Sequence, residues 1–452
     1  YKLSLNVRHS SKDIMTTMRT DSVDTVHRLS SNDTHQKSEL LTDQDVRYIV
    51  ERKLHGNNFN IVNSSMVSVD NTNGYLGQYY NVHVTIKLDD SSIKILNFFV
   101  KTLPPTNSPQ YAFILRYDTF NKEILIYTDV IRRMGVGKGF KWLAECYLCK
   151  KDSIIVLENA KIEGYVIHDK HVPFDESHCI LTIKALSNFH SRSLILDEKL
   201  RSTGRTIFDI YGHLFNEVIF NEDELARKIF KESINAIFLL IDLDDRLNNE
   251  DKDKLKKRVN SWALIFPNLL IPSKKYRNVI CHRDLWANNI MFKYDSNGSP
   301  FGCYLIDFQM VRYCPPAIDV VLSLYLITDR TTRDRHFESL LKIYHDSLKK
   351  ALKEEGFDIE ECLPWLSFRD SCYETKNIAL FFALMNLQLM LMPSQAAEEF
   401  MGSPDDFEKV LYGEKRSELV RSQYEKVEPY RNRIRENLLE VFEILPDQPS
   451  NI

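Results

Sequence analysis

The chain has 452 residues, more than one hydrophobic core usually supports, so at least two packed units are expected. Hydrophobic residues make up 43% and charged residues 27%, proportions typical of a globular protein. The formal net charge of -4 is small for this length, which argues against a nucleic-acid-binding or anionic-membrane-binding protein, since both require a basic face. We therefore expect no nucleic acid and no membrane as partners, and the sequence gives no reason to infer an obligate protein partner.

The cysteines and the apolar segments bear on the compartment. The eight cysteines are scattered, and Cys146-x-x-Cys149 has no second pair to complete a zinc site, which predicts free thiols in a reducing compartment. The longest apolar stretch, 378–392, contains Asn386 and Gln388 and is shorter than the ~20 residues that span a bilayer, so a buried helix is predicted. The N-terminal part of the sequence contains no apolar run that resembles a signal peptide. These features predict a cytoplasmic protein.

The first part of the chain reads as an arm followed by a small sheet. Residues 1–40 are rich in Ser, Thr, Asp and His, which predicts a disordered arm. Thr42 is a candidate cap for a helix that runs toward Gly56. Alternating apolar residues over 79–88 and 93–101, around a polar turn, predict a β-hairpin.

The next segments complete a small N-terminal unit. The apolar spacing over 113–134 predicts one helix, with Leu115 and Phe120 on its apolar face. Residues 153–157 predict a third short strand. The unit would therefore cover residues 41–158.

The remainder, 159–452, is predicted to be mainly helical. Helical patterns cover 181–196, 207–241 and 250–265, and everything after 316. Only 278–308 returns to short strands, with a polar turn at 295–298. The sequence thus predicts an α+β protein with a small sheet lobe and a large helical lobe.

The most informative motif lies in this strand-rich interval. The run Cys281-His-Arg-Asp-Leu-Trp-Ala-Asn-Asn289 is followed, after the turn, by Ile306-Asp-Phe-Gln309. Phosphoryl transfer needs positioning, charge neutralisation by Mg²⁺ and an acceptor for the proton of the nucleophile. Asp284 is the candidate catalytic base, whereas Asn289 and Asp307 offer the oxygen ligands that Mg²⁺ prefers. The alternative is that Asp284 and Asn289 only cap turns, because both residue types are common there.

This motif resembles the catalytic loop and DFG segment of the protein-kinase-like superfamily. In detail, H-x-D-x-W-x-x-N-x-M followed by D-F-Q is similar to the ecdysteroid kinase-like (CHK kinase-like) family, which is related to choline kinases and aminoglycoside phosphotransferases. The resemblance implies a two-lobed protein-kinase-like fold that uses ATP and Mg²⁺. His282 would support the loop by hydrogen bonding.

The resemblance also implies a nucleotide site in the N-terminal unit. Lys101, at a strand end, would bind ATP phosphates and pair with Glu123 of the following helix, and backbone groups near Glu158 would hold adenine. Gly74 and Gly77 resemble the loop that covers the nucleotide. Each has a simpler interpretation: a solvated edge lysine, a solvent-facing glutamate at 123 or 158, and ordinary turn glycines.

Two further residues are predicted to support the loop and not to react. His190 lies in a segment that resembles the L-A-x-x-H helix end of the family and reads as a packed scaffold histidine. Asp319, which follows Pro315-Pro316, is predicted to cap a helix and brace the catalytic loop.

The acceptor is predicted to be a small-molecule alcohol. The segment from Asp307 to Asp319 is too short for a peptide-docking platform and lacks Ala-Pro-Glu. The resemblance implies an ecdysteroid-like or other lipophilic alcohol; a choline, ethanolamine or aminoglycoside kinase and a nucleotide-binding pseudokinase scaffold remain alternatives. Residues that line the acceptor pocket, or else simply fill a helix core, are Phe381, Phe382, Met385, Met390 and Met392.

Overall fold

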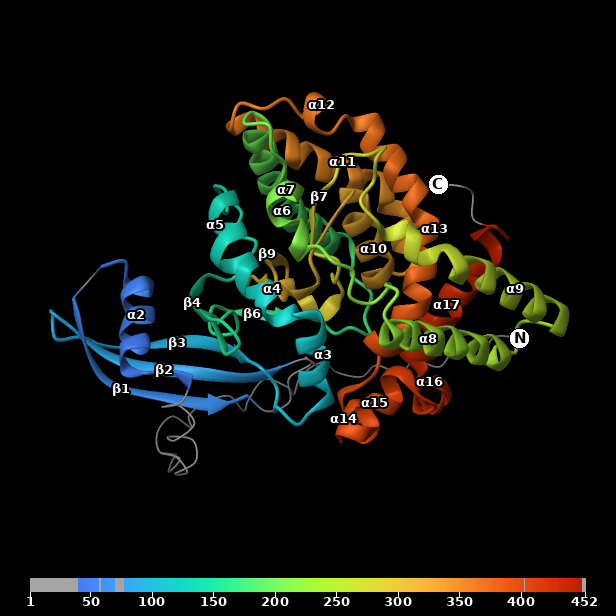
Figure 1. Ribbon diagram of the computed structural model, residues 1–452, viewed down its shortest axis with the longest axis horizontal. Helices are drawn as coiled ribbons and strands as arrows, with labels where there is room; N and C mark the ends of the chain where they lie inside the picture. The colour runs from blue at the N-terminus through green and yellow to red at the C-terminus, as the bar shows by residue number, and fades with distance from the viewer. Residues whose placement is uncertain (1–39, 57, 70–76, 402, 449–452) are drawn as a thin grey trace, which may run out of the picture.

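The computed structural model describes residues 40–56, 58–69, 77–401 and 403–448 (Figure 1). A small lobe built around a sheet lies beside a much larger, mainly helical lobe, so the chain has the α+β, two-lobed architecture that the sequence predicts. The predicted arm, apart from its last residue, and Gly74 lie outside the described residues.

The small lobe contains a five-stranded antiparallel sheet in the order β1-β2-β3-β5-β4. Its strands are β1 (Phe59–Ser68), β2 (Gln78–Leu88), β3 (Ile93–Thr102), β4 (Cys146–Lys150) and β5 (Ile154–Glu158). The predicted hairpin is confirmed as β2–β3, and the third strand as β5. Strands β1 and β4 were not predicted, because β1 is largely polar and β4 is short.

One face of this sheet is covered by α2 (Asp43–Leu54). Thr42 begins the helix with a capping box: its side chain accepts from the backbone N–H of Asp45, whose carboxylate accepts from the backbone N–H of Thr42. The apolar side chains Val46 and Ile49 are buried against the strands. The helix predicted from Thr42 is therefore confirmed.

The single helix predicted over 113–134 is wrong. The chain forms α3 (Pro109–Tyr117), α4 (Thr119–Leu125), a π-helical turn (Ile126–Val130) and α5 (Ile131–Met134). Asp118 separates α3 from α4 in the left-handed region, with φ of 50°. Because the axis breaks there, Leu115 is 52% exposed, whereas Phe120 is buried. The predicted single helix is therefore two helical segments, one before Asp118 and one after it.

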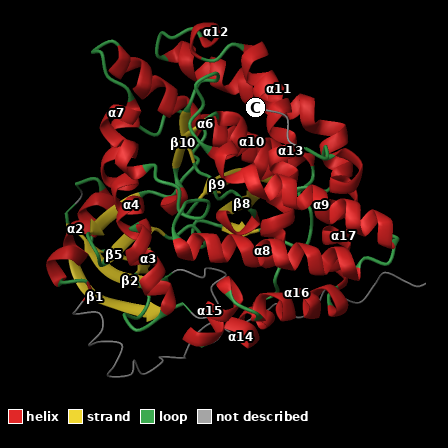
Figure 2. Cartoon of the chain, turned by 45° about the vertical axis from the view of Figure 1, so that its right-hand side comes forward, coloured by secondary structure: helices red, strands yellow, loops and turns green. Residues whose placement is uncertain are grey.

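The large lobe is helical, as shown by colour in Figure 2. Its helices are α6 (Glu176–Arg201), α7 (Ile207–Tyr211), α8 (Glu224–Leu243), α9 (Asn249–Ile265), α10 (Pro316–Ile327), α11 (Arg330–Glu354), α12 (Ile359–Cys362), α13 (Trp365–Met390), α14 (Ser394–Met401), α15 (Pro404–Tyr412), α16 (Lys415–Lys426) and α17 (Glu428–Ile444). Two small sheets are β6-β8-β9 (Tyr165–Ile167, Ile290–Tyr294, Pro300–Leu305) and β7-β10 (Val279–Cys281, Arg312–Cys314).

The predicted continuous helix 207–241 is also wrong, because α7 and α8 are separated by an irregular loop. In this loop the Glu217 carboxylate accepts from the backbone N–H groups of Val218, Ile219 and Phe220, a side-chain alternative to helical bonding. Asp223 then caps α8 by accepting from the N–H of Leu225.

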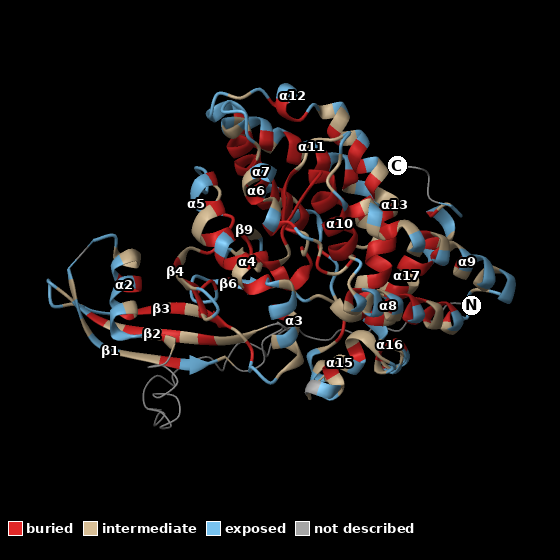
Figure 3. Cartoon of the chain, in the orientation of Figure 1, coloured by how far each residue is buried: buried red, intermediate tan, exposed pale blue. Residues whose placement is uncertain are grey.

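The apolar stretch 378–392 covers the second half of α13 and the two residues after it, and α13 packs against α8, α10 and α17. Figure 3 shows this helix as largely buried inside the large lobe. Among the described residues, no single helix is long and apolar enough to cross a bilayer. Taken together, α13 and α14 have the length and apolar composition of a span, but the pair is bent by 76°. All eight cysteines are free thiols, as predicted.

Candidate active site

The predicted catalytic loop connects β7 to β8 and is held by hydrogen bonds of a buried histidine. His282 is fully buried, and its Nε2 lies 3.0 Å from the carbonyl oxygen of Ile306. Because that oxygen only accepts, Nε2 carries the proton, and Nδ1 accepts from the N–H of Asp284 at 3.4 Å. Burial lowers the pKa of His282, which favours this neutral form. His282 thus positions Asp284 by hydrogen bonding.

Asp319 braces the same loop from the first turns of α10. Its carboxylate accepts from the backbone N–H groups of His282 and Arg283, and lies 3.2 Å from Nε2 of His190. His190 also contacts the Tyr344 hydroxyl at 2.6 Å. The predicted bracing and the scaffold interpretation of His190 agree with this geometry. The predicted cap does not, because Pro315 occupies the cap position and Asp319 lies inside α10.

Asp284 and Asn289 lie side by side, as their spacing suggests. The Asn289 amide nitrogen donates to the backbone oxygen and to the carboxylate of Asp284, each at 2.8 Å. A 3-10 turn, Ala287–Asn289, shortens the path between them. Both donor hydrogens of the amide are thereby used, which leaves its carbonyl oxygen as the group that is available to a cation.

Lys101, Glu123 and Asp307 form a second cluster that links both lobes. The Lys101 ammonium lies 2.6 Å from Glu123 of α4 and 2.9 Å from Asp307. Burial opposes the charge on Lys101, but the carboxylates of Asp307 and Glu123 outweigh it and raise the pKa of the ammonium. Lys101 is thus a fixed cation at the end of β3. The interpretations as a solvated edge lysine and a solvent-facing Glu123 are wrong, because both side chains are buried.

Asp307 adopts an unusual backbone conformation. Its φ of 70° is in the left-handed region, which is costly for a residue other than glycine. The Phe308 N–H donates to Glu123, and the Gln309 amide donates to the Asp307 carboxylate at 3.2 Å. Hydrogen bonds of the two following residues therefore hold this strained conformation, in which the Asp307 carboxylate contacts Lys101.

Asp284 is buried near the charge of Asp307. Burial, and then the charge of Asp307, raise the pKa of Asp284 to about 8. A carboxylate with a pKa near neutrality is well matched to accepting a proton from a reacting hydroxyl. Asp284, Asn289 and Asp307 also line one common cavity. The structure therefore brings the three residues of the predicted motif together.

Glu158 and Gly77 are the other described residues that are predicted to lie near a nucleotide. Glu158 does not sit in solvent: its carboxylate is paired with Lys141 at 2.7 Å and accepts from the Tyr304 hydroxyl. Its side chain is thus committed to the scaffold, and any adenine contact at this position would come from backbone groups. Gly77 lies immediately before β2, where an added Cβ would lie 3.2 Å from the backbone oxygen of Thr102. Its predicted contact with a nucleotide stays a prediction.

A cavity of about 240 Å³ opens beside the catalytic carboxylates. The lining is mostly apolar and comes from α8, α13, α15, α16, the loop before α8 and the segments 284–289 and 307–309. It comprises Ile219, Phe220, Ile229, Phe230, Ser233, Asp284, Trp286, Asn289, Asp307, Gln309, Met385, Asn386, Leu389, Met390, Leu411 and Arg416. Met385 and Met390 are thus wall residues, as predicted. Phe381, Phe382 and Met392 are not in this lining and are buried in the helix cores.

Arg416 of α16 is a cavity residue that the sequence analysis missed. It is 3% exposed, and its guanidinium donates to the side chain of Gln388 and the backbone of Met385. Among the described residues it forms no ion pair, and burial lowers its pKa to about 10, which leaves it charged at neutral pH. No motif signals this residue, because it lies far along the chain in a polar helix.

Tyr79 was also missed, although the hairpin contained the signal. In the β2–β3 register Tyr79 lies opposite Lys101, and its ring stacks on Phe99 with centroids 5.7 Å apart. Burial raises the pKa of Tyr79 to about 12. Counting back from the 89–92 turn would have placed the phenol beside the lysine.

The donor set of the site fits a hard divalent cation. Asp307 offers carboxylate oxygens. Because Asn289 bonds Asp284 through its amide nitrogen, its amide oxygen is left for a cation. Mg²⁺ takes oxygen ligands of this type together with those of a phosphate. Asp307 and Asn289 are therefore the residues that would hold Mg²⁺, whose chemistry is to neutralise charge on the transferring phosphoryl group.

The two-lobed fold, with a strand lysine paired to a helix glutamate, defines a protein of the protein-kinase-like class. The model of the ecdysteroid kinase-like family matches residues 71–357, well over half of the sequence. The chain belongs to the ecdysteroid kinase-like family, and this membership points to a small-molecule kinase.

Among solved structures, the chain is similar to the GDP and kanamycin complex of APH(2")-IIia. The sequence identity is 12% and the TM-score 0.37, with 84% of this chain and 98% of that chain covered. A search of curated proteins gave no match.

Proposed function

We propose that this protein transfers the γ-phosphate of ATP, with Mg²⁺, to the hydroxyl of a small, neutral, lipophilic alcohol. The single observation that carries the proposal is the position of Asp284: its carboxylate lies at the wall of a mainly apolar cavity, together with Asn289 and Asp307. A hydroxyl in that cavity would have its proton acceptor, and the cation-binding residues would lie at the same end.

In this mechanism each residue has one task. Lys101, held by Glu123, binds phosphate oxygens of the nucleotide, and Asp284 orients the acceptor hydroxyl and accepts its proton. His282 and Asp319 keep the loop in place and do not react. The apolar wall excludes water, which would otherwise compete with the alcohol as acceptor.

The charge of the cavity supports a neutral acceptor over a choline, ethanolamine or aminoglycoside. Asp284 and Asp307 are the acidic residues of the lining, and both belong to the catalytic machinery. Arg416 places a buried positive charge in the same wall. This charge would repel a cationic acceptor, and the lining has no further acidic side chain to pair with the cation. An ecdysteroid-like alcohol, which the family name suggests, satisfies the constraint.

The test is Mg-ATP consumption by the full chain with a panel of neutral and cationic alcohols. We expect turnover with neutral lipophilic alcohols and none in Asp307→Ala, which removes a proposed cation ligand. A wild-type protein that binds ATP but phosphorylates no member of the panel would instead support the pseudokinase scaffold. We further propose that the enzyme acts in the cytoplasm without nucleic acid, membrane or an obligate protein partner.

A further inference from the structure

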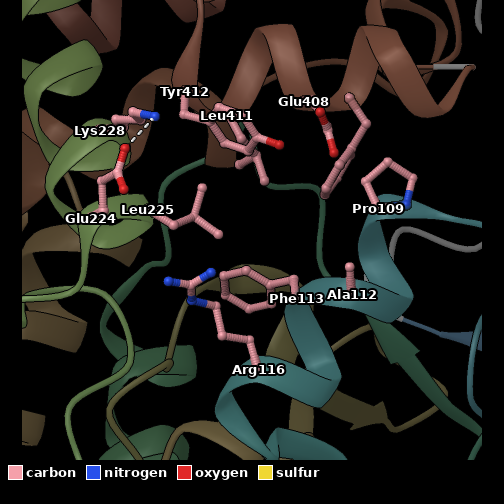
Figure 4. Close-up of a pocket in the computed structure, with 11 residues that line it drawn as sticks. Pro109, Ala112, Phe113, Arg116, Glu224, Leu225, Lys228, Glu408, Leu411 and Tyr412 are labelled. Atoms are coloured by element: carbon pink, nitrogen blue, oxygen red, sulfur yellow. Dashed lines mark ion pairs between the residues drawn. The ribbon is translucent and has the colours of Figure 1, made fainter.

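A second chamber lies between the two lobes, where α3 faces α8 and α15 (Figure 4). Its volume is about 360 Å³. In the figure, Phe113 and Arg116 project from α3, whereas Leu411 and Tyr412 project from α15 on the opposite side, with Leu225 of α8 between them. This outer chamber has a wall from each lobe, unlike the inner cavity beside Asp284.

Two elements line both chambers. Leu411 of α15 is part of the wall of each. On α8, Leu225 lines the outer chamber, and Ile229 and Ser233 line the inner cavity. These three residues are spaced by four, so they lie on one face of the helix. The rise from Leu225 to Ser233 is roughly 12 Å at ~1.5 Å per residue. One ridge of α8 therefore runs from one chamber into the other.

We infer that the two chambers are the inner and outer halves of one elongated acceptor site. The inner half holds the reacting hydroxyl beside Asp284, and the outer half holds the distal, apolar end of the same neutral alcohol. This inference rests on the proposed function. The inner cavity, at about 240 Å³, is smaller than the ~300–1,000 Å³ typical of small-molecule sites, whereas the two halves together fall within that range.

The charges of the outer chamber indicate a neutral occupant. Arg116 is paired with Asp223 through its Nε at 3.0 Å, and Lys228 with Glu224 at 2.8 Å. The remaining acidic side chain, Glu408, hydrogen-bonds Tyr412. Both basic side chains of the lining are therefore ion-paired and the Glu408 carboxylate is held by a hydroxyl, so the surfaces left for a ligand are those of Phe113, Leu225, Leu411 and Tyr412. Apolar and aromatic walls whose charged groups are already bonded within the protein favour a neutral, elongated, largely apolar molecule.

The outer chamber also gives the small lobe a part in acceptor selection. The Tyr117 hydroxyl and Arg116 of α3 both donate to Asp223, which caps α8, so two walls of the chamber, one from each lobe, are tied together. A long acceptor would contact both lobes, whereas a short one would contact only the large lobe. Phe113 and Leu411 are accordingly specificity-determining residues for acceptor length.

The experiment compares a short and a long neutral alcohol, 1,4-butanediol and 1,12-dodecanediol. Ala112 lines the outer chamber and is solvent-exposed, so Ala112→Trp fills the chamber without disturbing a core. The matched control is Leu115→Trp on the same helix, at a 52% exposed position outside the lining. Phe113→Ala, which removes a wall of the chamber, is the second variant. Binding is measured by calorimetry, and KM and kcat by Mg-ATP turnover.

We expect Ala112→Trp to weaken binding of 1,12-dodecanediol at least tenfold and to raise its KM, with 1,4-butanediol unchanged; Phe113→Ala should act in the same direction and Leu115→Trp should change neither diol. Equal effects on both diols, or no effect of Ala112→Trp and Phe113→Ala, would overturn the inference. Calorimetry separates this result from the proposed function: length-dependent binding without phosphate transfer would sustain the elongated site and reject the kinase assignment.

Discussion

The catalytic loop and the wall of the acceptor cavity differ in how they are built. In the loop, His282 and Asp284 are fixed by a chain of hydrogen bonds: the Asp284 N–H donates to His282, and the His282 N–H donates to Asp319. In the wall, Met390 and Leu411 are half-buried apolar residues that contribute shape and no directional bonds. A hydrogen-bonded loop holds one geometry, whereas a wall of Met and Leu side chains adapts to different shapes. The chemistry is therefore expected to be rigidly specified, and the choice of acceptor to be adjustable.

The largest effect is expected in the loop, from Asp284→Ala. Loss of the proton acceptor should lower kcat by about 10²–10⁴-fold. ATP affinity should be largely kept, because the Lys101–Glu123 pair is untouched. Steady-state kinetics and nucleotide titration check both. Asp284→Asn, which keeps the shape, is the control; near-normal turnover in either variant would contradict the assignment of Asp284 as base.

The next effect is expected on stability, from Asp319→Ala. This change leaves the backbone N–H groups of His282 and Arg283 without their acceptor and removes the buried contact to His190. Leaving such a donor without an acceptor costs about 1–3 kcal/mol for each group in the free energy of unfolding. Denaturant unfolding measures the loss, and Asp319→Asn, which keeps one acceptor oxygen, should lose less. A variant as stable as the wild type would show that the brace is unimportant.

A smaller effect is expected in the cavity wall, from Arg416→Met. Removing the buried positive charge should raise the kcat/KM for a cationic alcohol, relative to a neutral one, by about tenfold, which corresponds to ~1.4 kcal/mol. Competition between choline and a neutral alcohol of similar size measures the change. The control is Arg421→Met on the same helix, where the side chain is half exposed. Unchanged selectivity would contradict a role of the Arg416 charge and would assign the choice of acceptor to the shape of the cavity wall alone.

The smallest effect is expected from Met390→Leu in the same wall. The two side chains have similar volumes, so the free energy of unfolding should change by less than about 1.5 kcal/mol. The kcat should be unaffected, while the KM values of bulky acceptors shift by a few-fold. Thermal unfolding and kinetics with two acceptors of different shape check this. A large loss of kcat would break the distinction between loop and wall.

Sequence reasoning succeeded where the determining contacts are local. The β2–β3 hairpin follows from alternation and a polar turn, and Asp284 and Asn289 meet because only four residues and one tight turn separate them. It failed for the helix predicted over 113–134 and for the one over 207–241. In both, the apolar spacing continues through a break that Asp118 or the Glu217 loop imposes.

What the sequence by itself determined is the loop 281–289, with the proposed base and the proposed cation-binding residues, and the division into a sheet lobe and a helical lobe. Only the tertiary structure placed Lys101 against Asp307, 206 residues away, and brought Leu411 and Arg416 to the acceptor cavity. The physical reason is range. Turns, caps and short motifs are set by neighbours along the chain, whereas a cavity wall is assembled from distant helices whose positions depend on the packing of the whole core.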